Sequence, residues 1–278
     1  MDQKIPAYIP AGSDPNKVDP LCQAAGVENK ALIPLAGRPI ISYVLEALDK
    51  AERIESITIV GLDEKQIDIQ TEKSLNFIPS SGTNFDTAMK AVNYFTSLQN
   101  PPQYVLSLSS DIPFITHEII DRNINLAEKI GKKFEKKTGK PIELFYPFVP
   151  KKIVEKRFPQ ATKRFRKFTE GVFATGDFFV YSPQAALKPE AQQVAHAIMK
   201  NRKNILKILG GFSLIAIFKY LFGRLSLETD VKPTLKRVMN IELETLISKD
   251  PEICVDLDYP EDLEKFEYLI KALQLSEA

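Results

Sequence analysis

Short apolar segments alternate with amphipathic segments between residues 7 and 116, and this alternation limits the possible folds more than any other feature of the sequence. Two amphipathic segments carry an apolar stripe at helical spacing, which predicts helices that bury one face. Strands that alternate with helices favour an α/β fold with a doubly wound, mixed but mostly parallel sheet, whose ligand crevice lies at the carboxyl ends of the strands. The predicted strands are 7–12, 56–61, 75–79 and 104–110, and the stripes run through Ile40, Ile41, Val44, Leu45 and Leu48 and through Phe85, Ala88, Met89, Val92 and Phe95.

The overall charge gives little indication of a polyanionic partner. The 278 residues include 37 basic and 36 acidic side chains, a formal net charge of +1, so we expect no nucleic-acid ligand. Two distant cysteines, Cys22 and Cys254, are too few for a disulfide scaffold, and the first residues lack a secretory signal, which favours a cytoplasmic protein. Lys207 and Lys219 interrupt the most apolar window, 205–222, so we expect no transmembrane segment.

Polar residues follow three of the predicted strands. After the first strand, the loop PAGSDPNKVDP (10–20) is followed by Lys30, and its backbone amides together with an ammonium group suit a phosphate. After the fourth, Asp111 in LSLSSDIPFIT is a candidate ligand for a hard metal ion. Each feature also has a purely structural interpretation, since such loops are commonly turns and an aspartate before a proline commonly forms a turn or caps a helix.

The third strand end lies near the C-terminus. We predict a strand over 253–257 that places Asp256 and Asp258 on one face, followed by a helix that Pro260 opens. That helix would bury Leu263, Phe266, Ile270 and Leu273. The alternative is that Asp258 only stabilises the helix start through the helix dipole.

These motifs together carry a resemblance to a known family. The segments IPAGS, NKALIPLAGRPIISYVLEAL, LSSDIPFIT and VDLDYPEDLEKF resemble, in order and spacing, the MobA-like NTP transferase superfamily, which has a GT-A-like Rossmann core. The resemblance covers residues 7 to about 116 and about 252 to 270. It implies a single nucleotidyltransferase-like domain over 1–278, in which 140–240 form a variable acceptor or lid region with a helical and β-hairpin insertion.

The resemblance implies roles for particular residues. Asp111, Asp256 and Asp258 would bind Mg²⁺, and Lys30, Asp111 and Asp258 would act in catalysis. The first loop, Lys30, Asp111 and the turn before the helix at 84 would bind the nucleotide, and the segment after residue 175 would bind the acceptor. The implied nucleotide contacts are Ala11, Gly12, Ser13, Lys30, Gly82, Thr83, Asn84 and Asp111, and the implied acceptor contacts are Gly176 and Asp177.

The middle of the chain lies outside the resemblance. Eight basic residues with interleaved phenylalanines occupy 151–167, a pattern compatible with nucleic acid, a membrane surface, a phosphorylated substrate or a solvated face. A strand pair is predicted over 171–183, turning around Thr175, Gly176 and Asp177. The window 205–222 predicts a helix that is apolar on more than one face, broken at Gly210–Gly211, and suited to a buried helix, a cap over the crevice, a dimer contact or a bilayer interface.

The expected function is that of a Mg²⁺-dependent nucleotidyltransferase. It would join the NMP moiety of an NTP to a small phosphorylated acceptor and release pyrophosphate, with a homodimer as a possible assembly. Two alternatives remain from the sequence: a GT-A glycosyltransferase that uses a nucleotide-sugar, and a catalytically inactive nucleotide-binding homologue.

Overall fold

The computed structural model describes residues 3–14, 19–80, 82–201, 204–211 and 214–277. Within them, nine strands form one sheet in the order β5-β4-β1-β6-β10-β7-β9-β8, and β11 pairs with β7. Its strands are β1 (Ile5–Pro10), β4 (Ile54–Val60), β5 (Ser74–Ile78), β6 (Val105–Leu108), β7 (Leu144–Pro150), β8 (Arg166–Phe168), β9 (Gly171–Thr175), β10 (Phe178–Tyr181) and β11 (Leu243–Ile247). The predicted mixed, mostly parallel sheet is confirmed, because β5, β4, β1 and β6 run parallel and antiparallel strands follow beyond β6.

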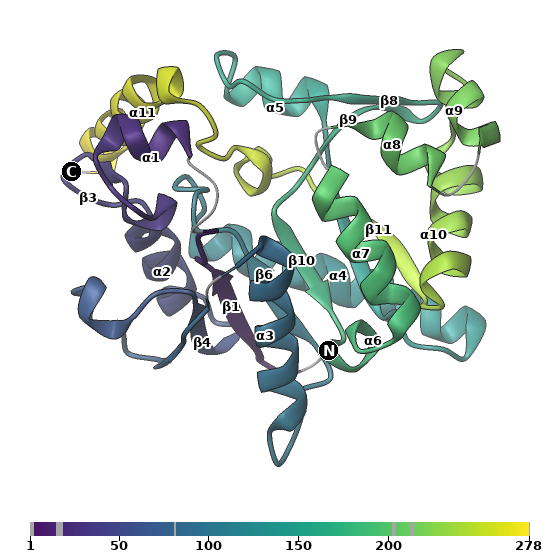
Figure 1. Cartoon of the computed structure of the whole chain (residues 1–278), viewed down its shortest axis with the longest axis horizontal. Helices are drawn as coiled ribbons and strands as arrows, with labels where there is room; N and C mark the ends of the chain where they lie inside the picture. The colour runs from purple at the N-terminus through teal and green to yellow at the C-terminus, as the bar shows by residue number, and fades with distance from the viewer. Residues whose placement is uncertain (1–2, 15–18, 81, 202–203, 212–213, 278) are drawn as a thin grey trace.

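Helices cover both faces of the parallel half of the sheet (Figure 1). Ile5, Ala7 and Ile9 of β1 join the main core, whereas Tyr8 joins a smaller core on the opposite face, as expected for a strand buried on both sides. The helices are α1 (Pro20–Ala25), α2 (Ile41–Lys50), α3 (Asn84–Ser97), α4 (His117–Thr138), α5 (Lys151–Arg157), α6 (Pro183–Ala186), α7 (Pro189–Asn201), α8 (Ile205–Gly210), α9 (Leu214–Leu221), α10 (Lys232–Met239) and α11 (Leu263–Glu277).

The four predicted strands are confirmed to within two residues at each end, as β1, β4, β5 and β6. The apolar stripe of α2 is also confirmed, because Ile40, Ile41, Val44, Leu45 and Leu48 are fully buried. The stripe of α3 is shifted: Val92 and Phe95 are buried, but Thr87 and Ala91 take the other buried positions, and Phe85, Ala88 and Met89 are half-buried.

The predicted strand over 253–257 is wrong. A 3-10 turn, η4 (Pro251–Cys254), is followed by extended chain outside the sheet up to Asp258. Ile253, Val255 and Leu257 are buried by the main core rather than by pairing with another strand, which explains why their apolar pattern imitated a strand. Pro260 begins a further 3-10 turn, η5 (Pro260–Asp262), which continues into α11. In α11, Phe266 and Ile270 are buried and Leu263 packs against the core, while the side chain of Leu273 lies outside the described part.

The predicted strand pair over 171–183 does not turn back on itself. Its two halves, β9 and β10, follow one another along the same edge of β7, where Phe148 pairs with Thr175 and Phe145 with Val180. The interruption at Gly176–Asp177 lets the second half move across to pair with β6 as well. The hairpin in this region instead joins β8 to β9.

The apolar window at 205–222 forms two short helices, α8 and α9, so the break expected at Gly210–Gly211 is confirmed. The inward face of α9 packs beside a cluster of Phe148, Phe168, Phe173, Leu225 and Leu227. Further elements are the hairpin strands β2 (Pro34–Leu35) and β3 (Arg38–Pro39), the 3-10 turns η1 (Lys30–Leu32) and η2 (Glu64–Gln66), and the π-helical turn η3 (Leu227–Val231). Among the described residues, no helix combines the length and apolarity that a bilayer crossing requires.

Candidate active site

Lys30 joins two carboxylates that come from distant parts of the chain. Its ammonium group lies 2.5 Å from an oxygen of Asp111 and 3.0 Å from an oxygen of Asp258. Asp111 follows β6 and is buried, whereas Asp258, between η4 and η5, is partly open to solvent. Burial lowers the pKa of Lys30, but Asp111 and Asp258 outweigh that effect and raise it, so the amine stays protonated.

The main chain and a hydroxyl group hold Asp111 in place. The Ser109 hydroxyl donates to a carboxylate oxygen of Asp111 at 2.5 Å. The backbone amide of Leu257 donates to the carbonyl oxygen of Asp111 at 3.0 Å. This second bond ties the chain after β6 directly to the segment that carries Asp256 and Asp258, so the two predicted strand-end motifs meet.

A second lysine–carboxylate pair adjoins the first. Lys163, in the loop before β8, forms an ion pair with Asp256, and both side chains are largely buried. Asp177, at the interruption between β9 and β10, completes the group: its amide donates to the carbonyl of Ile253 at 2.7 Å. Burial raises the pKa of Asp177, and the negative charge of Asp256 adds to this while Lys163 opposes it. The pKa of Asp256 is raised as well, mainly by burial.

The donor set of this site fits a hard divalent cation. Carboxylate oxygens of Asp111, Asp256 and Asp258 lie within 4.8 Å of one another. Together with Asp177 they place four carboxylates beside the two ammonium groups of Lys30 and Lys163, which leaves two negative charges in excess when all are ionised. Oxygen ligands of this kind are those that Mg²⁺ prefers.

The first loop lies against α3. Asn29 connects this loop to Lys30, because its side-chain amide donates to the carbonyl of Ala11 at 2.7 Å and its oxygen accepts from the amide of Ala31. A Cβ at Gly12 would lie 2.3 Å from the hydroxyl of Thr87, so the close approach of the loop to α3 requires glycine at this position. Ser13, the next residue, is exposed.

The turn before α3 serves first as a helix cap. Thr83 is the N-cap of α3, with its hydroxyl accepting from the amide of Asp86 and the Asp86 carboxylate accepting in return. Gly82 has φ of 126°, a conformation that favours glycine. The backbone amide of Thr87 donates to the carbonyl of Thr83, so the turn that carries Gly82, Thr83 and Asn84 lies one helical turn from the contact between Thr87 and Gly12. The structure therefore brings the two expected nucleotide-binding segments to the same edge of the sheet.

Gly176 and Asp177 were both expected to contact the acceptor, but the two residues lie in different surroundings. Gly176 is buried, with space for a Cβ limited by Pro147 and Ile253 at 3.1–3.2 Å. Asp177 adjoins the carboxylates instead, because its backbone lies between Ile253 and Ser109.

Three residues of the site were missed at the sequence level: Lys163, Ser109 and Asn29. Lys163 lies in the basic stretch 151–167, where nothing in the spacing separates it from its exposed neighbours. The phenylalanines of that stretch also point inward: Phe158 is buried against Phe114. Phe168 packs with Phe148 and Phe173. Phe158 belongs to the main core and Phe168 to the cluster beside α9, so neither ring is exposed for stacking with bases.

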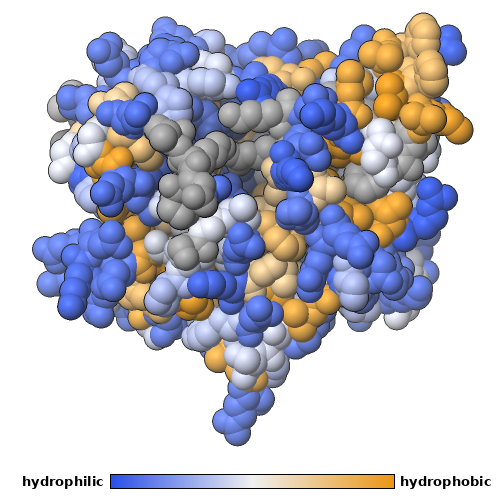
Figure 2. All heavy atoms as spheres, viewed as in Figure 1, coloured by the Kyte–Doolittle hydropathy of each residue, from blue (hydrophilic) through white to orange (hydrophobic). Residues whose placement is uncertain are grey.

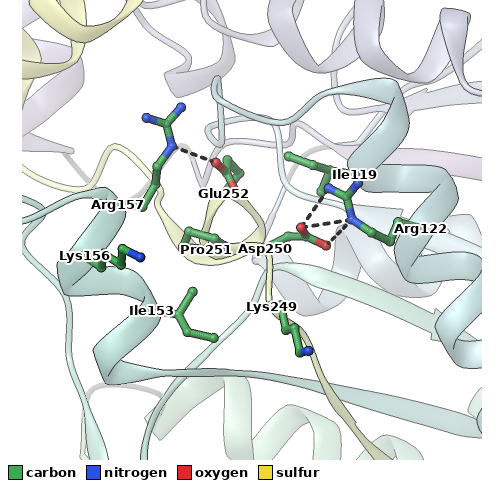
Figure 3. A pocket seen from close by; sticks show the side chains of 9 residues that line it. All are labelled: Ile119, Arg122, Ile153, Lys156, Arg157, Lys249, Asp250, Pro251 and Glu252. Atoms are coloured by element: carbon green, nitrogen blue, oxygen red, sulfur yellow. Dashed lines mark hydrogen bonds and ion pairs between the residues drawn. The ribbon is translucent and has the colours of Figure 1, made fainter.

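A hollow of about 330 Å³ lies between α4, α5 and η4 (Figure 3). Its two carboxylates are already paired, Asp250 with Arg122 and Glu252 with Arg157. It shares no residue with the group of Asp111, Asp177, Asp256 and Asp258. Its ion pairs instead fasten η4, the turn that leads into Asp256, to the neighbouring helices.

Comparisons with known proteins bear on the family and the fold of this chain. The family model described as Cytidylyltransferase matches residues 23–272. No curated protein matches the sequence significantly. A solved structure described as a hypothetical transferase from Thermus thermophilus is 27% identical, with a TM-score of 0.71 over 94% of this chain and 100% of its own.

Two more distant structures share the fold. A 4-diphosphocytidyl-2C-methyl-D-erythritol synthase from Anaerococcus prevotii is 12% identical, with a TM-score of 0.52 over 97% of this chain and 99% of its own. A CMP:2-keto-3-deoxy-manno-octonic acid synthetase complexed with CTP is 11% identical, with a TM-score of 0.52 and the same two coverages. The comparisons thus confirm the resemblance to nucleotidyltransferases. The family model that matches is a cytidylyltransferase, whereas the sequence motifs had suggested the MobA-like branch.

Proposed function

Because this chain belongs to the cytidylyltransferase family and is therefore a nucleotidyltransferase, we propose that it transfers CMP from CTP to a small phosphorylated acceptor. An oxygen of the acceptor phosphate attacks the α-phosphorus of CTP, the bond from that phosphorus to the bridging oxygen breaks, and pyrophosphate leaves. The observation that carries the proposal is the convergence of Asp111, Asp256 and Asp258, whose oxygens lie within 4.8 Å of one another beside the ammonium group of Lys30.

Asp111, Asp256 and Asp258 are the residues that would hold Mg²⁺, since their oxygens already lie within 4.8 Å of one another. When bound, Mg²⁺ neutralises phosphate charge and fixes the orientation of the phosphates. The protein needs no nucleophile of its own for this reaction, because alignment and charge neutralisation supply most of the acceleration.

Lys30 is proposed to bind the phosphates of CTP. In the free protein its ammonium group forms ion pairs with Asp111 and Asp258, and a bound phosphate is an alternative partner for the same group. The backbone from Ala11 to Ser13 lies beside α3, so phosphates on this loop would place the nucleoside toward Gly82 and Asn84. Because the Thr83 hydroxyl caps α3, we assign hydrogen bonding with the base to the exposed Asn84 side chain and to the backbone at Gly82.

Asp177 and Lys163 are proposed to face the acceptor. Both come from the variable region and both reach the carboxylate group, whereas Gly176 is held by packing. The glycosyltransferase alternative has no comparable support: its usual Asp-x-Asp would lie after β6, where this chain has Ser109, Ser110 and Asp111, and the family match is to a cytidylyltransferase.

Thermal unfolding with each of CTP, UTP, ATP and GTP, with and without Mg²⁺, tests the proposal. A ligand at about 100 times its Kd adds about 2.7 kcal/mol to the free energy of unfolding. We expect stabilisation by CTP that requires Mg²⁺, that is lost in Asp111→Asn and that persists in Asp68→Asn, an exposed control in the loop before β5. Stabilisation by another base alone would correct the nucleotide, and none with any nucleotide would contradict the proposal. Pyrophosphate release with CTP and a panel of phosphorylated sugars and polyols then identifies the acceptor.

A further inference from the structure

The outward face of α9 presents a group of large apolar side chains to solvent. Leu214, Ile215, Phe218, Leu221 and Phe222, here called the α9 patch, are between 61% and 75% exposed. Figure 2 shows apolar surface gathered at the upper right of the molecule, where Figure 1 places α9. The opposite face of the helix is occupied, because Ala216, Ile217 and Tyr220 pack against the cluster of Phe148, Phe168 and Phe173. The patch is therefore a surface feature of an anchored helix.

The surroundings of the α9 patch are basic. Residues 191–226 contain no aspartate or glutamate, but they contain Lys200, Arg202, Lys203, Lys207, Lys219 and Arg224. Lys219 is neutralised by Asp230 at 2.5 Å. Lys200, Lys207 and Arg224 are exposed and form no ion pair within the described ranges. Lys167 adds a further cation, because its ammonium group approaches Gly223 next to Phe222.

We infer that the α9 patch docks this protein on an anionic lipid bilayer. Exposed leucine, isoleucine and phenylalanine on one helix face, beside the exposed Lys207 and Arg224, which form no ion pair in the described part of the chain, have the chemistry of a helix that lies in the plane of the headgroups. The basic side chains around the patch favour a bilayer over a second copy of the chain as the binding partner. Two copies joined through this face would bring their lysines and arginines together, whereas an anionic bilayer complements them.

The position of the patch links docking to the acceptor side of the site. The cluster beneath α9 includes Phe168 of β8 and Phe173 of β9, and β9 leads directly to Gly176 and Asp177. In Figure 1, α9 lies at the upper right beside β8, whereas β1 and the first loop lie in the left half of the view. The connection between the patch and the site therefore runs through β9. The inference itself concerns the surface alone and does not depend on the proposed reaction.

Sedimentation of the full chain with vesicles tests this inference. We compare vesicles of phosphatidylcholine with vesicles of equal parts phosphatidylcholine and phosphatidylglycerol, at low and high salt. Because each cation near an anionic surface contributes about 1 kcal/mol, we expect at least about tenfold more binding to the anionic vesicles and a decrease with salt. The double variant Ile215→Asp with Phe218→Asp should lose this binding, whereas Tyr268→Asp, an equally exposed position on α11, should retain it.

A charge-reversal variant separates the contribution of the basic side chains from that of the apolar side chains. Lys207→Glu with Arg224→Glu leaves the apolar side chains in place and should weaken binding to anionic vesicles at least about thirtyfold without changing the unfolding temperature. Equal binding to both kinds of vesicle, or binding that survives Ile215→Asp with Phe218→Asp, would overturn the inference. Failure of the wild-type protein to bind either kind of vesicle would also overturn the inference. That holds for a monomer and for a dimer that Ile215→Asp with Phe218→Asp dissociates, which sedimentation velocity would detect.

Discussion

The ammonium group of Lys30 lies 3.0 Å from the carboxylate of Asp258, although 228 positions separate the two residues. The same ammonium group lies 2.5 Å from Asp111. In the free protein, Lys30 therefore forms ion pairs with two of the carboxylates that are assigned here to a metal ion. A lysine in this position competes with the metal for its ligands and also offers a charge to the phosphates of the nucleotide.

Lys30→Met separates these two effects. Without the ammonium group, Asp111 and Asp258 lose a competing cation, so we expect Mn²⁺ or Mg²⁺ alone to bind about tenfold more tightly, a change of about 1.4 kcal/mol. CTP should bind more weakly in the presence of the metal, because a phosphate contact is lost. Titration calorimetry measures both affinities, with Lys65→Met as an exposed control. An unchanged metal affinity would place the metal away from Asp111 and Asp258.

Lys163→Met should destabilise the fold. It leaves Asp256 largely buried without its partner, which typically costs about 3 kcal/mol. The double variant Lys163→Met with Asp256→Asn removes both charges and should recover most of that loss. Urea unfolding gives the values, and Lys152→Met, an exposed lysine of the same basic stretch, should change the free energy of unfolding little. A double variant no more stable than Lys163→Met would show that Lys163 acts through packing alone.

Gly12→Ala tests the close approach between the first loop and α3. The added Cβ would lie 2.3 Å from the Thr87 hydroxyl, and overpacking of this kind typically costs about 1–3 kcal/mol. Combining it with Thr87→Ala removes the clashing atom and should restore most of the stability. If the double variant is stable but binds CTP poorly, Gly12 also contacts the nucleotide; if stability does not recover, the clash is not the cause of the loss.

Glu170 should make the free energy of unfolding depend on pH in the acid range. Its carboxylate accepts hydrogen bonds from the Ser226 hydroxyl and from the amides of Leu227 and Glu228 at the start of η3. Partial burial acts to raise the pKa of Glu170, but these hydrogen bonds outweigh it and lower the pKa from 4.5 to about 2. A carboxylate whose pKa is lowered on folding stabilises the protein fully above its unfolded value and loses that effect as the pH falls.

We therefore expect the free energy of unfolding to fall between about pH 4.5 and pH 2 through this group. Glu170→Gln should be less stable at pH 7, by about 1 kcal/mol at most because the site is exposed, and should show a shallower dependence in that window. Thermal unfolding across the acid range measures it, beside Glu55→Gln on the exposed side of β4. Equal slopes for wild type and Glu170→Gln would assign the acid sensitivity to other groups.

The core strands and the principal charged residues could be predicted from the sequence because their signals are local. The segments of β1, β4, β5 and β6 are short apolar runs with polar ends, separated by helices. Four such runs in this arrangement are typical of strands that are buried on both faces of a sheet. Lys30 and Asp111 were found because each follows such a run at the edge where ligands bind. These inferences needed only the order of the elements.

The segment around Asp256 shows where local signals fail. Ile253, Val255 and Leu257 alternate as a strand would, yet they are buried by the main core without strand pairing. Burial alone produces the same pattern in a strand and in irregular chain, so the sequence could not distinguish them. The sequence predicted that Asp256 and Asp258 lie near Asp111, but it did so through a strand over 253–257 that the structure does not contain.

Composition, and the order of strands and helices from β1 to β6 with the residues at their ends, are properties of neighbouring positions, and for these the sequence was sufficient. The tertiary structure decided which distant charges meet. Lys163 is one of several basic residues in its stretch, and only the path of the chain into β8 buries it against Asp256. In the same way, the interruption between β9 and β10 brings Asp177 to the site because β7 pairs with both halves of one extended segment, whereas β6 pairs only with the second. A lone charge carries no periodic signal, so its partner is fixed only when the sheet assembles.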